Sequence, residues 1–286
     1  MIDGKSTLKH NLGIGNVGCD IGTQTIAYSS DKEVGLENLA QRGDNVEVVL
    51  NKLELIQQKM DIERRKLNPE YFNPDGTIKE FEKGFKRKWK TSEKLKRLRI
   101  RLQNIYRKNT INKKIANNEL VNKIRSLGNV VITESKNANR LKVKAKTETT
   151  INKKTGKCNK KKRFGKSIQN RCPGYIQMKL QQKFQNTGGI YIEVPNNYKA
   201  SQYDHTANAY IKKDLNDRYY ALYDGTMVQR DMYSAFLLQN FKQENQIIID
   251  KEKCRSNFNN FYQLQNKRIY EIQQNKEKIY NSGIKF

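Results

Sequence analysis

Three acidic residues stand where enzymes often carry catalytic carboxylates. Asp20 lies inside the apolar run Val17–Ile21. Glu134 ends the apolar run Val130–Thr133, and Asp231 opens a predicted helix. A carboxylate in an apolar strand is costly unless it is paired or bound to a metal ion, and Mg²⁺ and Mn²⁺ prefer carboxylate oxygens. If the fold brings the three acids together, they predict a site for two metal ions about 4 Å apart that cleaves a phosphodiester by in-line displacement.

Each acid taken alone also has an ordinary structural explanation. Asp20 would be a hydrogen-bonded residue at a turn, Glu134 a solvated residue at a strand end, and Asp231 the N-cap of its helix. Separation along the sequence does not show whether the three acids converge. Their convergence is therefore an expectation that depends on the fold.

The sequence is strongly basic, and its charge is unevenly distributed. It has 286 residues, with 56 Lys and Arg against 29 Asp and Glu, which gives a formal net charge of +27. Lys83–Lys114 contains 14 basic residues and one acid, and Lys136–Lys166 contains 13 basic residues and one acid. Such blocks repel themselves unless an anionic polymer neutralises them, so they predict nucleic-acid binding; solvated charge runs without a role are the alternative. The candidate contacts are Lys86, Arg87, Lys88, Lys90, Lys94, Arg97, Arg101, Lys160, Lys161, Lys162 and Arg163.

Other features argue against several protein classes. No apolar run approaches the roughly 18 residues of a membrane span, and residues 1–10 lack the apolar stretch of a secretory signal. The four cysteines are far apart without a CxxC pair, so neither a disulfide framework nor a cysteine-rich zinc module is expected. We expect a cytoplasmic protein that is associated with the nucleoid through DNA, with no membrane partner and no small-molecule substrate.

Strands and helices alternate along the chain, which favours the α/β class. Apolar residues at intervals of three and four predict long helices over Asp44–Leu67 and Ser92–Leu127, joined as an antiparallel hairpin. Shorter helices are expected from Pro173 and over Asp231–Phe241. The β-prone runs predict strands within Asn16–Ser30, over Val130–Thr133 and over Ile190–Val194.

The expected organisation has four parts. Residues 1–43 begin an α/β domain, and residues 44–127 insert the basic helical hairpin. Residues 128–243 complete the domain and include a basic loop over 135–167. Residues 244–286 form a polar, mostly helical tail with little core.

The segments around the three acids resemble the RuvC motifs of transposon-encoded OrfB/TnpB proteins, which are often called transposases and are related to type V CRISPR effectors. These segments are Val17–Thr23, Val130–Glu134 and Gln229–Leu237. The resemblance covers most of Gly15–Leu238. Further segments that look like the family are Asn73–Thr77, Lys161–Ser167 and Lys199–Gln202.

The resemblance implies an RNase H-like (RuvC) mixed sheet with the helical hairpin and basic loop inserted. It also implies a metal-dependent DNA endonuclease, with Asp20, Glu134 and Asp231 at the catalytic and metal-binding positions for two Mg²⁺ or Mn²⁺ ions. In such proteins base pairing with a guide RNA reads the target, and the protein holds the backbones. DNA and, in the full-length form, a guide RNA are the implied partners.

Two departures from the family pattern are visible. The family normally has a sizeable region before the first catalytic Asp, whereas Asp20 stands near the start here, so we expect an N-terminally truncated chain. Many members carry a four-cysteine zinc knuckle before the third motif, but Pro195–Arg230 contains no cysteine. His205 alone cannot make a tetrahedral site. We predict no structural zinc, an irregular Asn196–Asp224 and a polar loop role for His205.

Two alternative functions stay open beside the endonuclease. One is a truncated remnant that binds DNA or RNA without cleaving it, which the short N-terminal region favours. The other is an unguided junction resolvase, which would not need the basic Lys83–Lys114 hairpin. Covalent strand transfer by a Tyr-His-His arrangement is not expected, since His10 and His205 are the only histidines.

Overall fold

The computed structural model of the protein describes residues 12–41, 46–135, 165–195, 197–214 and 216–285. Met1–Ala40 and Ala116–Phe286 together form one unit, and Gln41–Ile115 form a second. The expected boundary of the helical insertion at residue 127 is therefore displaced to residue 115. The physical reason is that the last turns of its second helix, α2 (Glu93–Leu127), pack on the sheet of the first unit.

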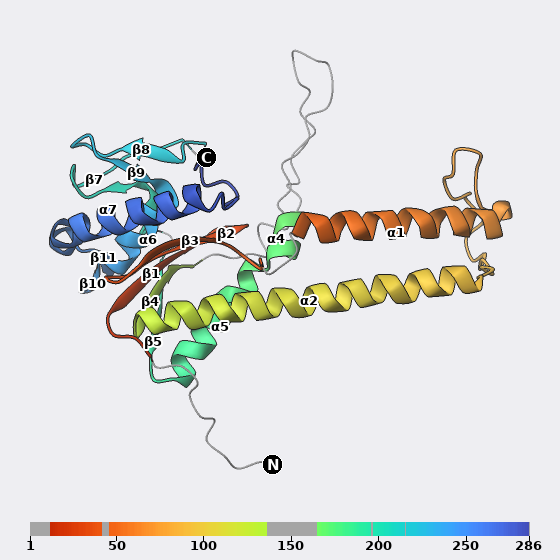
Figure 1. Ribbon diagram of the computed structural model, residues 1–286, viewed down its shortest axis with the longest axis horizontal. Helices are drawn as coiled ribbons and strands as arrows, with labels where there is room; N and C mark the ends of the chain where they lie inside the picture. The colour runs from red at the N-terminus through yellow and green to blue at the C-terminus, as the bar shows by residue number, and fades with distance from the viewer. Residues whose placement is uncertain (1–11, 42–45, 136–164, 196, 215, 286) are drawn as a thin grey trace, which may run out of the picture. The chain divides into compact units, whose positions relative to one another are not determined.

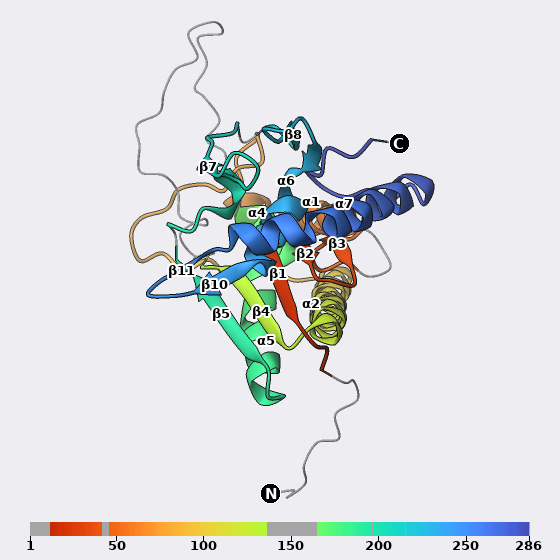
Figure 2. The ribbon, with the colours of Figure 1, turned by 90° about the vertical axis from the view of Figure 1, so that its left-hand side faces the viewer.

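A five-stranded mixed sheet forms the centre of the first unit, in the order β3-β2-β1-β4-β5 (Figure 2). Strands β1, β2 and β3 are antiparallel, whereas β4 and β5 run parallel to β1. The predicted α/β class is confirmed. The strands are β1 (Asn16–Ile21), β2 (Thr25–Ser29), β3 (Val34–Asn38), β4 (Val130–Glu134) and β5 (Ile190–Val194).

The two faces of the sheet carry separate cores, because successive side chains of a strand point to opposite sides. On one face, Val17, Cys19 and Val131 pack against α5 (Pro173–Asn186) and the end of α2. On the other face, Ala27 and Ile132 pack into a core that includes residues of α6 (Arg230–Gln239) and α7 (Lys251–Gln274). Figure 1 shows these two helical layers on either side of the strands.

Gly18 allows α6 to touch the central strand. A Cβ atom at Gly18 would stand 2.0 Å from the carbonyl oxygen of Ala235 and 2.4 Å from the amide nitrogen of Gln239. The Asn16 side-chain amide donates to the carbonyl of Gln239 over 3.2 Å. The end of α6 thus lies beside Asn16 and its middle beside Gly18, so α6 runs antiparallel to β1 and its first turn is directed toward Asp20.

The C-terminal tail contributes to the core of the first unit. We expected little core in residues 244–286, but α7 buries Cys254, Phe261 and Ile272. The sequence did not indicate this buried face, because its apolar residues are widely spaced along the helix and separated by polar ones. Arg268 of α7 pairs with Glu277 at 2.8 Å and with Glu37 of β3 at 3.4 Å.

The segment between β5 and α6 folds into two short antiparallel hairpins, which we call the hairpin lobe (residues 200–229). The expectation that Asn196–Asp224 is irregular is wrong, because strands of two or three residues are too short to show a period of two. The lobe consists of η2 (Ala200–Gln202), β6 (Tyr203–Asp204), β7 (Ala209–Tyr210), β8 (Tyr219–Ala221) and β9 (Met227–Gln229).

The second unit is an antiparallel hairpin of α1 (Val46–Leu67) and the first part of α2 (Figure 1). Ile56, Met60 and Leu95 form its core. No helix in the described part of the chain is both long and apolar enough to cross a membrane. The remaining elements are η1 (Pro69–Tyr71), α4 (Gly165–Arg171), β10 (Phe241–Gln243) and β11 (Ile247–Ile249).

Candidate active site

Asp20 lies near the carboxyl end of β1, on the face that α6 covers. Its neighbours Cys19 and Ile21 both belong to the core on the opposite face. Because side chains alternate along a strand, Asp20 points to the same side as Gly18, where α6 packs. The side chain is half-buried. Asp20 lies within the strand and is not a turn residue, as its ordinary structural explanation would have required.

Glu134 lies on the adjacent parallel strand, at the same level as Asp20. Thr133 is the register partner of Cys19, so the next residues along the two strands are Glu134 and Asp20. Glu134 shares its face with Ile132, which packs into the core beside α6. Burial foremost, and nearby negative groups that include Glu134, raise the pKa of Tyr198, whose hydroxyl donates to the Leu237 carbonyl over 2.8 Å. Asp20 and Glu134 are thus at the carboxyl edge of two parallel strands on the α6 face.

Asp231 is the second residue of α6 and is not its N-cap, so the structural alternative for this residue is wrong. The N-cap is Gln229, whose side-chain oxygen accepts from the amide of Met232 over 2.8 Å. Burial, and after it the negative charge of Asp20, raise the pKa of Asp231. Arg218 opposes this effect from 3.9 Å. The tertiary structure therefore places Asp20 and Asp231, which are 211 positions apart in the sequence, near enough for their charges to interact.

The first turn of α6 is fixed by a buried hydrogen-bonded residue that sequence reasoning missed. The Gln229 backbone amide donates to the Gln265 side-chain oxygen over 3.0 Å. The Gln229 side-chain amide donates to the Ser282 carbonyl over 3.2 Å. A glutamine just before a helix was the available sequence signal, but it does not reveal its partners in α7 and near the C-terminus. These two bonds fix the position of Gln229, which directly precedes the helix that carries Asp231.

The acidic pair matches the donor chemistry of a divalent metal ion in part. Asp20 and Asp231 offer carboxylate oxygens, and a cation between them would relieve the repulsion that raises the pKa of Asp231. Within the described ranges, however, no three His, Cys, Asp or Glu side chains stand close enough together to hold a metal ion. Two of the three predicted ligands, Asp20 and Asp231, thus fit a divalent metal ion. The third, Glu134, lies on the same face of the sheet but does not complete a group of three.

The predicted nucleic-acid contacts fall into distinct groups. Lys86, Lys88, Arg97 and Arg101 are exposed in the second unit. Three others are bonded within that unit: Arg87 donates to the Lys79 carbonyl, Lys90 pairs with Glu70 at 3.3 Å, and Lys94 pairs with Glu63 at 2.8 Å. The candidates in the basic loop lie outside the described residues: Lys160, Lys161, Lys162 and Arg163.

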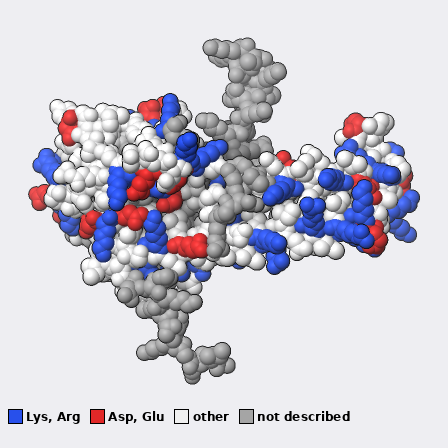
Figure 3. All heavy atoms as spheres, in the orientation of Figure 1, with Lys and Arg blue, Asp and Glu red and all other residues white. Residues whose placement is uncertain are grey.

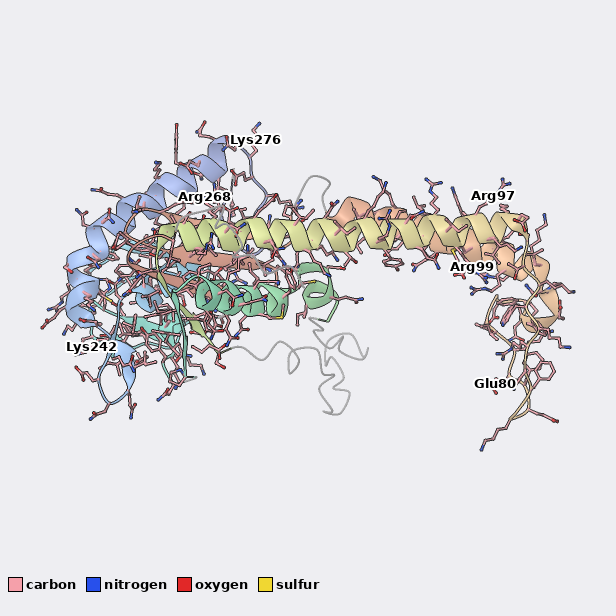
Figure 4. The ribbon with its side chains drawn as sticks, turned by 90° about the horizontal axis from the view of Figure 1, so that it is seen from below. Glu80, Arg97, Arg99, Lys242, Arg268 and Lys276 are labelled. Atoms are coloured by element: carbon pink, nitrogen blue, oxygen red, sulfur yellow. The ribbon has the colours of Figure 1, made fainter. Side chains whose placement is uncertain are left out.

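Three cationic residues of α2, with three uncharged ones, line a hollow of about 390 Å³, which we call the α2 hollow. Arg97, Arg101 and Lys108 lie on one helical face, since they are four and seven residues apart. Figure 4 shows Arg97 and Arg99 leaving α2 in different directions, and Figure 3 shows many Lys and Arg side chains on the hairpin. Lys108 was missed, although its spacing from Arg101 was the available signal. The remaining lining residues are Ile100, Asn104 and Ile105.

His205 lies in the turn after β6, so its expected loop position is confirmed, but its side chain is buried and bonded. Its Nδ1 lies 2.8 Å from the hydroxyl of Tyr233 on α6. Burial lowers the pKa of His205 below its ordinary value of 6.5; Asp204 and Asp224 oppose this shift and Arg255 adds to it. The prediction of no structural zinc in this segment stays a prediction.

The buried His205 predicts a loss of stability on mild acidification. Because its folded pKa lies below 6.5, its contribution is full above that pH and is lost as the pH falls through the folded value. The melting temperature of the wild type should therefore drop between pH 7 and pH 5 by more than that of His205→Asn, which cannot be protonated there. Thermal unfolding at several pH values measures this, and equal pH profiles of the two proteins would contradict it.

Comparison with known proteins gives remote structural likeness only. No protein-family model matches the sequence, and no curated protein matches it. One solved structure, titled "Cryo-EM structure of the Cas12f1-sgRNA-target DNA complex", contains a chain that is similar at 13% sequence identity and a TM-score of 0.41. The match covers 81% of this chain and 40% of that chain, so this chain spans less than half the length of the protein that it resembles.

Proposed function

We propose that this chain is a RuvC-like, metal-dependent DNA endonuclease with Asp20, Glu134 and Asp231 as its catalytic carboxylates. The observation that carries the proposal is the packing of α6 on the face of β1 that carries Asp20, which directs the first turn of α6 and its Asp231 toward Asp20. The register of β1 and β4 adds Glu134 at the same level and on the same face. The mixed sheet supports the RNase H-like fold that the three motifs imply.

The proposed site would hold its metal ions through the three carboxylates. Two bound Mg²⁺ or Mn²⁺ ions would supply activation of water and stabilisation of the leaving 3′ oxygen. The residues of this chain then have defined tasks. Gly18 lets α6 approach the strand, Gln229 fixes the start of the helix, and Arg218 limits the negative charge at Asp231.

Cleavage assays with purified protein test this proposal. We expect Mg²⁺-dependent cutting of single-stranded or R-loop DNA, with RNA guidance and a transposon setting inferred from the OrfB/TnpB resemblance. Four-way junctions without RNA belong in the same assay, because cutting of junctions alone would select the unguided resolvase. No cleavage of any of these substrates in Mg²⁺ or Mn²⁺ would overturn the proposed activity.

A nucleic-acid-binding protein without cleavage is the second candidate function. Two observations favour it: Arg218 occupies one side of Asp231, and no group of three metal ligands occurs among the described residues. Binding in EDTA that is unaccompanied by cleavage in Mg²⁺ or Mn²⁺ would select it.

We further propose that the α2 hollow binds the phosphate backbone of DNA or guide RNA. Within the part of the chain that the structure describes, Arg97, Arg101 and Lys108 form no ion pair that would compete with phosphate, and arginine forms bidentate bonds with phosphate. Changing all three to Gln should weaken binding at physiological salt by at least about tenfold. It should also reduce the slope of log affinity against log salt by about 2, because up to three phosphate contacts are lost.

The second unit offers a control with the same change in charge. Lys90, Lys94 and Lys96 are each paired with a glutamate of their own unit, at 3.3, 2.8 and 2.6 Å. Their triple Gln variant should alter the salt slope by less than half as much. Fluorescence anisotropy over a salt series measures both variants, and equal slopes would show that only net charge matters.

A further inference from the structure

A buried hydrogen-bonded pair joins the hairpin lobe to α6. His205 follows β6 and is 2% exposed, and Tyr233 of α6 is fully buried. The backbone amide of His205 donates to the Tyr233 hydroxyl over 3.2 Å, and His205 Nδ1 lies 2.8 Å from the same oxygen. Both contacts of His205 thus meet at one hydroxyl oxygen, which joins the lobe to α6 through the backbone amide and through the ring.

The lobe is held together next to this pair by a buried carboxylate. One oxygen of Asp204 accepts from the Thr206 amide over 2.9 Å and from the Thr206 hydroxyl over 2.6 Å. The other oxygen accepts from the amide of Tyr223, in the turn of the second hairpin, over 3.0 Å. Asp204 therefore ties the two hairpins together, so that His205 extends from a braced support.

Asp231 and Tyr233 leave α6 on different sides. Residues two positions apart are rotated by about 200° around a helix and do not face each other. The side with Asp231 is directed at Asp20 of the sheet, and the side with Tyr233 is bonded to the lobe. The His205 ring also packs 4.5 Å from the Phe258 ring of α7. The first turns of α6 are thereby held between the sheet and the lobe.

We propose that His205 and Tyr233 are positioning residues, whose hydrogen bond fixes the first turn of α6 and so sets the separation of Asp231 from Asp20. Neither residue is assigned contact with substrate or metal. The inference rests on the proposed nuclease function. Loss of a group that orients a ligand-bearing residue typically lowers activity or metal affinity by about 10- to 100-fold.

The test compares two variants that each lose one buried tyrosine hydroxyl. Tyr233→Phe should lower kcat on the substrate that the wild type cuts by about 10- to 100-fold, with KM changed by less than about twofold. Tyr220→Phe is the matched control, because the two rings are 5.9 Å apart and the Tyr220 hydroxyl has no hydrogen-bond partner in the described part of the chain. An equal loss in both variants would overturn the proposal.

Two changes at the other partner separate orientation from packing. His205→Leu removes the ring nitrogen that bonds to the Tyr233 hydroxyl and should reproduce the loss of kcat seen in Tyr233→Phe. His205→Asn places a side-chain amide, which can accept or donate, near the position of Nδ1 and should restore most of the activity. Failure of the Asn variant to exceed the Leu variant would contradict a role for the hydrogen bond.

Hydrogen exchange separates failure of this proposal from failure of the nuclease function, since it needs neither metal nor substrate. Amides of residues 231–235 should exchange faster in Tyr233→Phe than in the wild type and in Tyr220→Phe. Unchanged exchange would show that the His205–Tyr233 hydrogen bond does not fix the first turn of α6, whatever the cleavage assay shows. Faster exchange with unchanged kcat would show that fixing this turn does not matter for cleavage. If Tyr233→Phe exchanges faster but the wild type never cleaves DNA, the role of the hydrogen bond in fixing α6 is supported and only the nuclease function is overturned.

Discussion

Replacing Asp20 by Asn is expected to lower the rate of Mg²⁺-dependent DNA cleavage by about 1000-fold, while nucleic-acid affinity in EDTA stays within about twofold. The amide keeps the size of the side chain but removes the negative charge that a divalent cation requires. Binding should survive because the proposed backbone contacts of Arg97, Arg101 and Lys108 lie in another unit of the chain. Single-turnover cleavage and anisotropy measure the two quantities.

Asp231→Asn should abolish cleavage to a similar extent and also raise the melting temperature at pH 7. Burial and Asp20 raise the folded pKa of Asp231, so the ionised carboxylate costs stability at a pH above that value, and the neutral amide removes this cost. Loss of activity together with a gain in stability is the usual sign of a strained functional site. The ion pair with Arg218, which is also lost, opposes the gain.

Asp224→Asn is the control for both changes. This aspartate is exposed in the turn of the second hairpin, where it accepts from the Thr226 amide, and Asn makes the same bond. Its activity and stability should match the wild type. Wild-type cleavage by the Asp20 variant would refute the assigned site, whereas a lower melting temperature of the Asp231 variant would refute the electrostatic account of that residue.

Gly18→Ala is expected to destabilise the fold by about 3 kcal/mol or more, the upper end of the cost of overpacking a core. The added Cβ would stand 2.0 Å from the Ala235 carbonyl oxygen and 2.4 Å from the Gln239 amide. Both atoms are backbone, so a rotamer change cannot relieve the clash, and α6 must move away from β1. That movement also carries Asp231 away from Asp20, so activity should fall even at temperatures where the variant stays folded.

Gly22→Ala provides a comparison in the same motif. The nearest atom to its Cβ would be the Thr25 carbonyl oxygen at 3.1 Å, which a small adjustment of the turn relieves. Its cost should stay within about 1 kcal/mol. Chemical denaturation measures both variants, and similar stabilities of the two would show that α6 is not packed directly on Gly18.

Much of the local structure was predictable because its signals lie within a few neighbouring residues. Apolar intervals of three and four gave α1 and α2 to within two residues of their observed bounds, and Ile190–Val194 matches β5. The strand β3 was missed because only Val34 and Leu36 are apolar in it. The short strands of the hairpin lobe and the buried face of α7 were missed for the same reason, since their local patterns are brief or diluted.

The candidate site divides in the same way. The sequence by itself determined which residues are acidic, which motifs contain them, and that the basic charge is concentrated in two segments. Only the tertiary structure decided that Asp231 meets Asp20, that Gln229 rather than Asp231 caps α6, and that Lys94 pairs internally while Arg97 lines a hollow. Residue types and local periodicities can be seen in neighbouring positions of the sequence. The contact of Asp231 with Asp20 depends instead on strand register and on the packing of α6 against Gly18, more than 200 residues away in the sequence.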